Sequence, residues 1–252
     1  MDGDVTLPIN FGIIKQDTPY WCGPATTQMI LSARGVSVGE QQLARELGTT
    51  TNGTNHVGLI ADRLNAWLGD FWVRRDIADP ASPAATEKLW ADIQHSILAG
   101  YGVACNVDVS PGNYPRPTRG ERLSYGGGRV LHYFAAMGFN ARTREVLVPD
   151  SGFPDYLYWM SVDQLATCIA AKGYAAAVNA PIVDEIDAPA VIDFIRKFCG
   201  PLISDTKDIR EQFCGMGSRD AGQYAGWPQL GKNDLGLNQT MVDAISDLRI
   251  GA

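Results

Sequence analysis

The feature that most constrains the fold is an apolar segment, Val130 to Phe139, in which His132 is the one side chain that ionises near neutral pH. A short polar turn and a second run, Glu145 to Val148, follow it, and this pattern predicts a β-hairpin. Asp150 comes just past the end of the second strand. A strand this apolar is an unusual place for an idle ionisable group, because most of its side chains are buried. His132 is therefore either a satisfied core histidine or a functional one, and we favour the second interpretation.

A helix is predicted over Cys22 to Ala33, with Pro24 near its first turn and Gly35 just past its end. Cys22 therefore lies at a helix N-terminus. Unpaired N–H groups and the positive end of the helix dipole stabilise a thiolate there, and the thiolate is the nucleophilic form of cysteine. Gln16 lies a few residues upstream, and its side-chain amide could join the Cys22 backbone N–H in binding an oxyanion.

The rest of the first 180 residues is predicted to mix helices and strands, which indicates an α+β domain. Further helices are expected from Ser37 to Gly48 with a capping box formed by Ser37 and Glu40, from the loop Thr49 to Thr54 as far as Gly69, over Ala85 to Ala99, and over about Val162 to Lys172. Further strands are expected over Phe71 to Ile77, Tyr101 to Val109 and Tyr174 to Val178. The segment Ser110 to Arg129 is rich in proline and glycine, so we expect a long, mobile surface loop that borders a substrate cleft.

A second unit is predicted from residue 181 to residue 252, because the acidic stretch Ile182 to Asp187 has the composition of a linker. Helical patterns follow around Val191 to Phe198, Lys207 to Phe213 and Gln239 to Leu248. A unit of this size buries only a marginal core, so we expect it to dock onto the first domain or onto another neighbour. Within it, Trp227 is either a sugar-binding platform or a buried aromatic anchor, and we favour the anchor.

Composition excludes several classes of function. The formal net charge of -7 gives no support for a nucleic-acid partner. No apolar run approaches the roughly 18 residues that cross a bilayer, so membrane insertion is not expected. The first residues are acidic where a secretory signal would be basic, and we expect the chain to start in the cytosol.

The five cysteines are widely spaced, odd in number and without a C-x-x-C pair, which argues against a disulfide framework and against structural zinc. Cys105 and Cys168 lie in apolar patterns and are expected to be ordinary core residues. Cys22 is the exception, because it lies at a helix start.

A thiolate at neutral pH needs a basic or cationic partner, and the chain has only three histidines. His56 is predicted at the start of the third helix and His95 on a solvated helix face, so neither is favoured as the partner of the Cys22 thiolate. His132 is the predicted base. We expect Asp150 to fix the imidazole tautomer, since the two hairpin strands would be neighbours in one sheet. Asp150 could instead cap a turn, and Asp108, also at a strand end, is the reserve candidate.

Three motifs resemble a known family: QDTPYWCGPA from Gln16 to Ala25, HYFAAMGF from His132, and VLVPDSG ending at Gly152. They are similar to the signature of papain-fold cysteine peptidases related to bacteriocin-processing enzymes. More narrowly, the N-terminal half resembles the peptidase domain of mycobacteriophage endolysins. The segment GWPQLG at 226 to 231, with Thr240 to Ala244, is similar to a small module of actinobacterial and phage cell-wall proteins.

The resemblance implies a papain-like α+β fold, in which a helical half carries the cysteine and an antiparallel sheet half carries the histidine and the aspartate. It implies that Gln16 serves the oxyanion hole, Cys22 is the nucleophile, His132 the base and Asp150 the orienting group. We expect Trp21 and Gly23 to contact the substrate.

The resemblance also implies the substrate and the setting. The expected substrate is a stem or cross-link peptide of peptidoglycan, and no metal or organic cofactor is expected. The enzyme would wait in the host cytoplasm until a holin opens the way to the wall, with further lysin domains as possible partners.

Two rival functions stay open. Transglutaminases and arylamine acetyltransferases also use Cys, His and Asp in that order, so a thioester could be passed to an amine instead of to water. The fold could also serve as a peptide-binding module without turnover.

Overall fold

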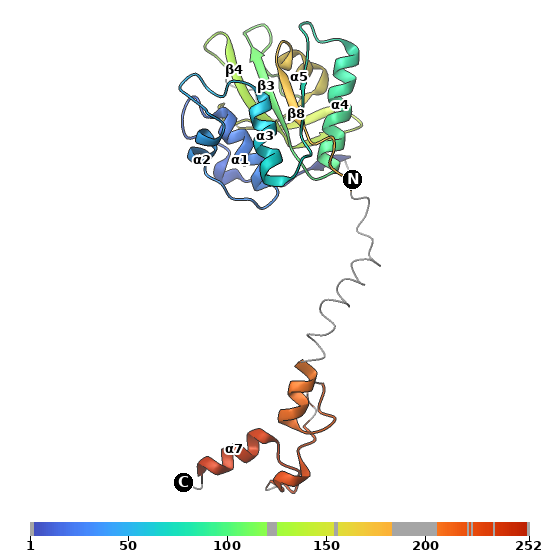
Figure 1. The fold of residues 1–252 in the computed structure, drawn as a ribbon. Helices are drawn as coiled ribbons and strands as arrows, with labels where there is room; N and C mark the ends of the chain where they lie inside the picture. The colour runs from blue at the N-terminus through green and yellow to red at the C-terminus, as the bar shows by residue number, and fades with distance from the viewer. Residues whose placement is uncertain are drawn as a thin grey trace. The chain divides into compact units, whose positions relative to one another are not determined.

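The computed structural model describes residues 3–119, 125–153, 156–182, 206–220, 222, 224–233 and 235–250, with side chains described as far as residue 245. The chain divides into two compact units, Met1–Val183 and Asp184–Ala252. The first unit mixes helices and strands, which confirms the α+β class (Figure 1). The helix predicted over 191 to 198 and most of the predicted linker lie outside the described residues.

Two four-stranded sheets, antiparallel throughout, form the framework of the first unit. One sheet has the strand order β2-β8-β3-β4 and the other has the order β1-β5-β6-β7. The strands are β1 (Asp4–Thr6), β2 (Val73–Asp76), β3 (Val103–Val109), β4 (Val130–Ala136), β5 (Gly138–Asn140), β6 (Glu145–Pro149), β7 (Leu157–Ser161) and β8 (Gly173–Ala176).

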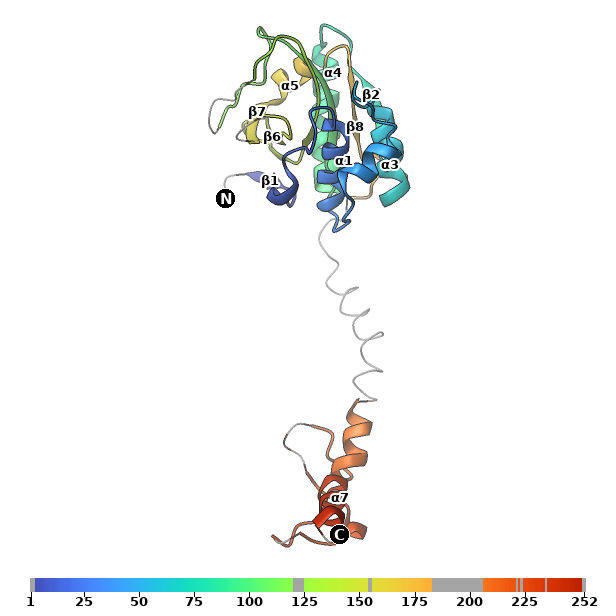
Figure 2. The same ribbon diagram turned by 90° about the vertical axis from the view of Figure 1, so that its left-hand side faces the viewer.

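Helices cover both faces of the first sheet (Figure 2). They are α1 (Cys22–Ser32), α2 (Glu40–Glu46), α3 (Val57–Leu68), α4 (Pro83–Leu98) and α5 (Val162–Ile169), with a short 3-10 helix η1 (Phe11–Ile13). Along β3, Cys105 and Val107 pack in a core with α4 and α5, whereas Ala104 packs in a second core with α1 and α3. Because alternate side chains of a strand point to opposite faces, this explains why β3 is apolar almost throughout.

The strand predicted over Val130 to Phe139 is divided at Met137, and the prediction that it forms one strand is wrong. Its first part, β4, pairs with β3, and its second part, β5, forms the hairpin with β6. His132 therefore lies in one sheet and Asp150 follows a strand of the other sheet, so the two are not carried by neighbouring strands of one sheet. The Met137 N–H donates to the Leu147 carbonyl at 2.9 Å, so β6 still lies against the end of β4.

The predicted capping box at Ser37 is also wrong. The helix α2 begins at Glu40 after Gly39, and no side chain caps it. The buried Glu40 carboxylate instead accepts a hydrogen bond from the Asp17 N–H at 3.1 Å. This contact ties the loop that contains Gln16 to α2.

The second unit contains a helical segment over residues 206–214, the 3-10 helix η2 (Pro228–Leu230) and the helix α7 (Met241–Ile250). Trp227 is half-buried, and its indole N–H donates to the Gln212 carbonyl at 3.0 Å, so the ring is anchored within this unit. Across the described parts of both units, every helix is too short or too polar to span a membrane.

Candidate active site

Cys22 is the first residue of α1, and only 7% of its surface is exposed. Its sulfur accepts hydrogen bonds from the backbone N–H groups of Gly23, at the helix start, and of Tyr133, on β4. The His132 side chain forms a third hydrogen bond with the same sulfur. The structure thus brings together a cysteine and a histidine that are far apart in the chain.

His132 is buried on β4 and lies between the cysteine and Asp150. Its Nε2 lies 2.9 Å from Asp150 Oδ1, which leaves Nδ1 to face the Cys22 sulfur. The Phe153 ring meets the imidazole edge-on, with 5.6 Å between the ring centroids. The ring is therefore fixed at both nitrogens and on one side.

Asp150 is fully buried and has a hydrogen-bond partner on each oxygen. Besides His132, Oδ1 accepts the Gly152 N–H at 3.1 Å. Oδ2 accepts the hydroxyls of Tyr125 at 2.5 Å and Tyr158 at 3.1 Å. Asp150 does not merely cap a turn, because its carboxylate is the hub of this network.

Sequence reasoning missed both tyrosines. Tyr125 belongs to the segment predicted as a mobile surface loop, yet its ring stacks on Phe153 with centroids 3.7 Å apart. Tyr158 lies on β7, a strand that was not predicted. The alternation in Leu157–Ser161, whose second and fourth residues are buried, is the signal that could have revealed the strand.

The electrostatics favour an ion pair between sulfur and imidazole. Burial by itself raises the pKa of Cys22, but the hydrogen bond and charge of His132, together with the Tyr133 and Gly23 backbone N–H groups, outweigh burial and lower the pKa below its ordinary value. Burial opposes the charge on His132 too, yet the neighbouring Asp150 carboxylate raises the pKa of the imidazole well above its ordinary value. The pKa of Asp150 is lowered against the effect of burial, chiefly by the imidazolium. The site therefore holds thiolate, imidazolium and carboxylate together.

Gln16 lies beside this group. Its Nε2 donates to the Thr18 carbonyl at 2.7 Å, and its Oε1 accepts the Ser151 hydroxyl at 2.9 Å. A Cβ atom at Gly152 would lie 2.8 Å from His132 Cε1 and 3.6 Å from Gln16 Oε1. The amide and the imidazole therefore flank the same glycine, and one amide hydrogen of Gln16 is not used by Thr18.

The two expected substrate contacts, Gly23 and Trp21, differ in how deeply they are buried. Gly23 is buried, and a Cβ atom at this position would lie 2.2 Å from Thr54 Oγ1, so there is no room for a side chain. Gly23 contributes its backbone N–H to the site, as a donor to the Cys22 sulfur. Trp21 is half-buried at the N-cap of α1, and its ring meets Tyr20 edge-on. A cavity of about 340 Å³ lies nearby and is lined by Gln16, Gly152 and Tyr156 among others.

The other candidates lie elsewhere. Asp108 pairs with Leu131, so its side chain points to the sheet face opposite that of His132, and it binds Arg129 at 2.5 and 2.7 Å. His56 occupies the N-cap of α3 without a side-chain capping bond. His95 is half-buried rather than solvated, because its Nε2 lies 2.9 Å from the Ala180 carbonyl.

The remaining described cysteines are free, and Cys105 and Cys168 are buried in the core as predicted. Within the described residues, no group of three or more His, Cys, Asp or Glu side chains is arranged to hold a metal ion. The reactive groups that the structure brings together in this site are the Cys22 thiolate and the His132 imidazolium. A cysteine on the helical half that meets a histidine and an aspartate of the sheet half is the papain-like arrangement.

Comparison with known proteins divides the chain in two. A model of the Peptidase_C39 like family matches residues 8–184, and a model of the Rv3766 C-terminal domain matches residues 178–251. A curated relative, the uncharacterized protein MTBMA_c00490 of Methanothermobacter marburgensis, is 36% identical over 96 residues, which are 38% of this chain. The match spans 64% of that relative's length.

The similar solved structures share less sequence identity with this chain than the curated relative does. The peptidase domain of Streptococcus ComA, a bi-functional ABC transporter involved in a quorum sensing pathway, is 15% identical with a TM-score of 0.41. The match covers 68% of this chain and 98% of that domain. A double glycine motif protease from an AMS/PCAT transporter is 13% identical with a TM-score of 0.39, covering 69% of this chain and 92% of that one.

Proposed function

The chain belongs to the Peptidase_C39-like family, and on that premise we propose that it is an active cysteine peptidase that cleaves peptide bonds of the cell wall. The observation that carries the proposal is the continuous hydrogen-bonded path from the Cys22 sulfur through His132 to Asp150. A purely structural histidine would not need to share its proton with a thiol at a helix start.

In the proposed reaction, the Cys22 thiolate attacks the carbonyl carbon of the scissile bond and forms a tetrahedral intermediate. The Cys22 backbone N–H and the amide hydrogen of Gln16 not used by Thr18 stabilise its oxyanion. Imidazolium His132 then protonates the leaving amine, and a thioester remains on Cys22. Asp150 keeps the imidazole oriented while its charge changes.

Water completes the reaction. Neutral His132 takes a proton from the attacking water, the thioester carbonyl becomes a carboxylic acid, and the thiolate is released. The Tyr125 and Tyr158 hydroxyls hold the carboxylate of Asp150 through both halves of the cycle, because they occupy the oxygen that does not face His132.

For the substrate, we propose the stem or cross-link peptides of peptidoglycan. The motif resemblance to mycobacteriophage endolysins supports this choice, and the cavity of about 340 Å³ next to Gln16 offers space for a short branched peptide. We further propose that the protein acts in the lysis of mycobacterial cells, reaching the wall from the host cytoplasm after a holin opens the membrane.

The direct test is to incubate purified mycobacterial wall peptides with the full chain and with the Cys22→Ala variant. Mass spectrometry should show new amine termini with the wild type and none with the variant. Cys105→Ala is the matched control, since it removes a buried thiol outside the site. If the wild type releases no amine from wall peptides, the proposed substrate is wrong; if it also cleaves no other peptide, the proposed activity is wrong.

A further inference from the structure

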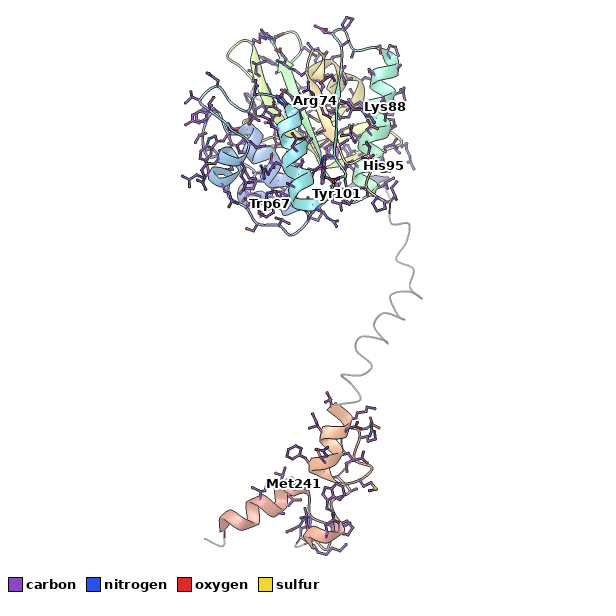
Figure 3. The ribbon with its side chains drawn as sticks, in the orientation of Figure 1. Trp67, Arg74, Lys88, His95, Tyr101 and Met241 are labelled. Atoms are coloured by element: carbon purple, nitrogen blue, oxygen red, sulfur yellow. The ribbon has the colours of Figure 1, made fainter. Side chains whose placement is uncertain are left out.

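A second cavity, of about 530 Å³, lies on the side of β4 away from the Gln16 loop. It is lined by the start of α3, the end of β2, the middle of β3 and the residues just before β8. Figure 3 shows Arg74 at the N-terminal end of α3, and Arg74 is one of the residues that line this cavity. The reaction proposed above leaves this cavity without a role.

Cationic side chains line the cavity in a protein whose net charge is -7. Arg74 and Lys172 contribute full charges, and His56 and the Asn106 amide contribute hydrogen-bonding groups. The Nδ1 atom of His56 is buried and lacks a hydrogen-bond partner among the described residues. Together these groups form a site that suits an anion.

Asp76 also lines the cavity and Asp108 lies beside Lys172, but these two carboxylates only partly neutralise the cations. Asp76 accepts two hydrogen bonds from Arg74, from Nε at 2.9 Å and from Nη2 at 3.2 Å, but the Asp76 side chain is 65% exposed and Nη1 of Arg74 lies outside this pair. Lys172 lies 4.0 Å from Asp108, whose oxygens are already used by Arg129. Each cation can therefore take a second carboxylate.

Two series of contacts link the cavity to the nucleophile. Asn106 is paired with Tyr133 across the sheet and donates to its hydroxyl at 3.0 Å, and the Tyr133 backbone N–H binds the Cys22 sulfur. On the other side, Thr54 packs on Gly23 and is followed directly by Asn55, which lines the cavity. An extended peptide advances roughly 3.3 Å per residue, so a substrate held at Cys22 would place a side chain here within a few residues of the scissile bond.

We propose that this cavity is an acid-selective substrate subsite, in which Arg74 and Lys172 bind a carboxylate of the peptide that Cys22 cleaves. The inference rests on the proposed peptidase function and adds a specificity to it. A carboxylate matches the forked donors of Arg74 and the point charge of Lys172, and the Asn106 amide can donate a further hydrogen bond. Stem peptides that carry free carboxylates would then be preferred over the same peptides with carboxamides.

The test compares two forms of one substrate. Mycobacterial wall peptides are used as purified and after their carboxylates have been converted to carboxamides. The full chain should cleave the free-acid form about tenfold faster in kcat/KM, and the double variant Arg74→Glu, Lys172→Glu should lose this preference. Arg142→Glu is the control, because Arg142 is exposed in the turn after β5, away from the cavity.

A second arm keeps this inference separate from the peptidase activity. In the Cys22→Ala background, calorimetry measures binding of the same two peptide forms, with and without Arg74→Gln and Lys172→Gln, which remove charge without reversing it. Tighter binding of the free acid that disappears with the glutamines supports the subsite, even if wild type cleaves nothing. Equal binding of the two forms, or a preference that survives in the glutamine variants, overturns it.

Discussion

The start of α1 and the interior of β3 each bury a cysteine, and the two thiols have opposite properties. Burial, together with the nearby Cys168 thiol, raises the pKa of Cys105 far above its ordinary value, and the single hydrogen bond from the Ala136 backbone N–H does not offset it. Cys22 is buried nearly as deeply, yet its pKa is lowered by His132 and two backbone N–H groups. Placement at a helix start beside an imidazole, and not exposure, therefore makes a cysteine nucleophilic in this fold.

The largest expected effect comes from removing each thiol in turn. Cys22→Ala should reduce kcat/KM on wall peptides by at least about a thousandfold, because no other group replaces the nucleophile. Cys105→Ala should leave kcat/KM within about twofold and lower the free energy of unfolding by roughly 1–2 kcal/mol. Urea unfolding and steady-state kinetics check both, and a large loss of activity in Cys105→Ala would contradict the comparison.

The second-largest expected effect on activity distinguishes Asp150 from Asp108, the two aspartates near strand ends. Asp150→Asn should lower kcat roughly a hundredfold or more, since an amide no longer selects the tautomer or balances the imidazolium. Asp108→Asn, which loses the pair with the exposed Arg129 and the longer contact with Lys172, should stay within about threefold. Similar losses in both variants would show that the assignment of the orienting group is wrong.

The helix start offers a smaller test. Gly23→Ala places a Cβ 2.2 Å from Thr54 Oγ1, so the first turn of α1 or the Thr54 loop must move, which should cost about 2–3 kcal/mol of stability. Gly39→Ala is the control, since a Cβ there meets open space. Thermal and urea unfolding measure both, and an unchanged stability of Gly23→Ala would rule out this close packing.

The smallest effect concerns the support of the Gln16 loop. Burial, together with the nearby Asp17 charge, raises the pKa of Glu40 from its ordinary value of 4.5 to about 7. The folded state therefore binds the Glu40 proton more tightly than the unfolded state does. The stability that the protonated Glu40 side chain contributes is lost as pH rises from about 4.5 through about 7. Glu40→Gln keeps the acceptor for the Asp17 N–H and should be more stable than wild type by about 2 kcal/mol at pH 8.

The control for that prediction is Glu87→Gln, whose side chain is 63% exposed. Urea unfolding at pH 5 and at pH 8 should show the gain only at pH 8 and only for Glu40→Gln. A gain of equal size at both pH values would mean that charge burial is not its cause.

The sequence indicated which residues lie together in the candidate site better than it indicated the framework that holds them. Cys22 and His132 were identifiable, because a cysteine at a helix start and a histidine in an apolar strand are both local features. Asp150 was identified for a partly wrong reason, since the expected single sheet is two sheets that meet at Met137. A change of sheet within an apolar run leaves no periodic signal, because both halves alternate in the same way.

The network around Asp150 could not be predicted for a different reason. Tyr125 approaches the carboxylate from a segment without periodicity, and only the tertiary fold brings it there. Likewise, Glu40 fits a capping box by sequence, but its buried contact with Asp17 replaces the local one. Rules based on neighbouring residues, such as the capping box, fail where a polar side chain forms its hydrogen bond with a residue far away in the sequence.

The rate of alkylation of Cys22 tests the central claim, a thiolate paired with an imidazolium, most directly. Full-length wild type and His132→Ala are treated with iodoacetamide from pH 5 to pH 9, and labelling at Cys22 and Cys105 is read by peptide mapping. In the wild type, Cys22 should react at pH 6 far faster than a free thiol and change little up to pH 8, while Cys105 stays unlabelled in both proteins. A Cys22 rate that climbs about tenfold per pH unit toward an ordinary pKa of about 8.5, alike in wild type and His132→Ala, would contradict the account.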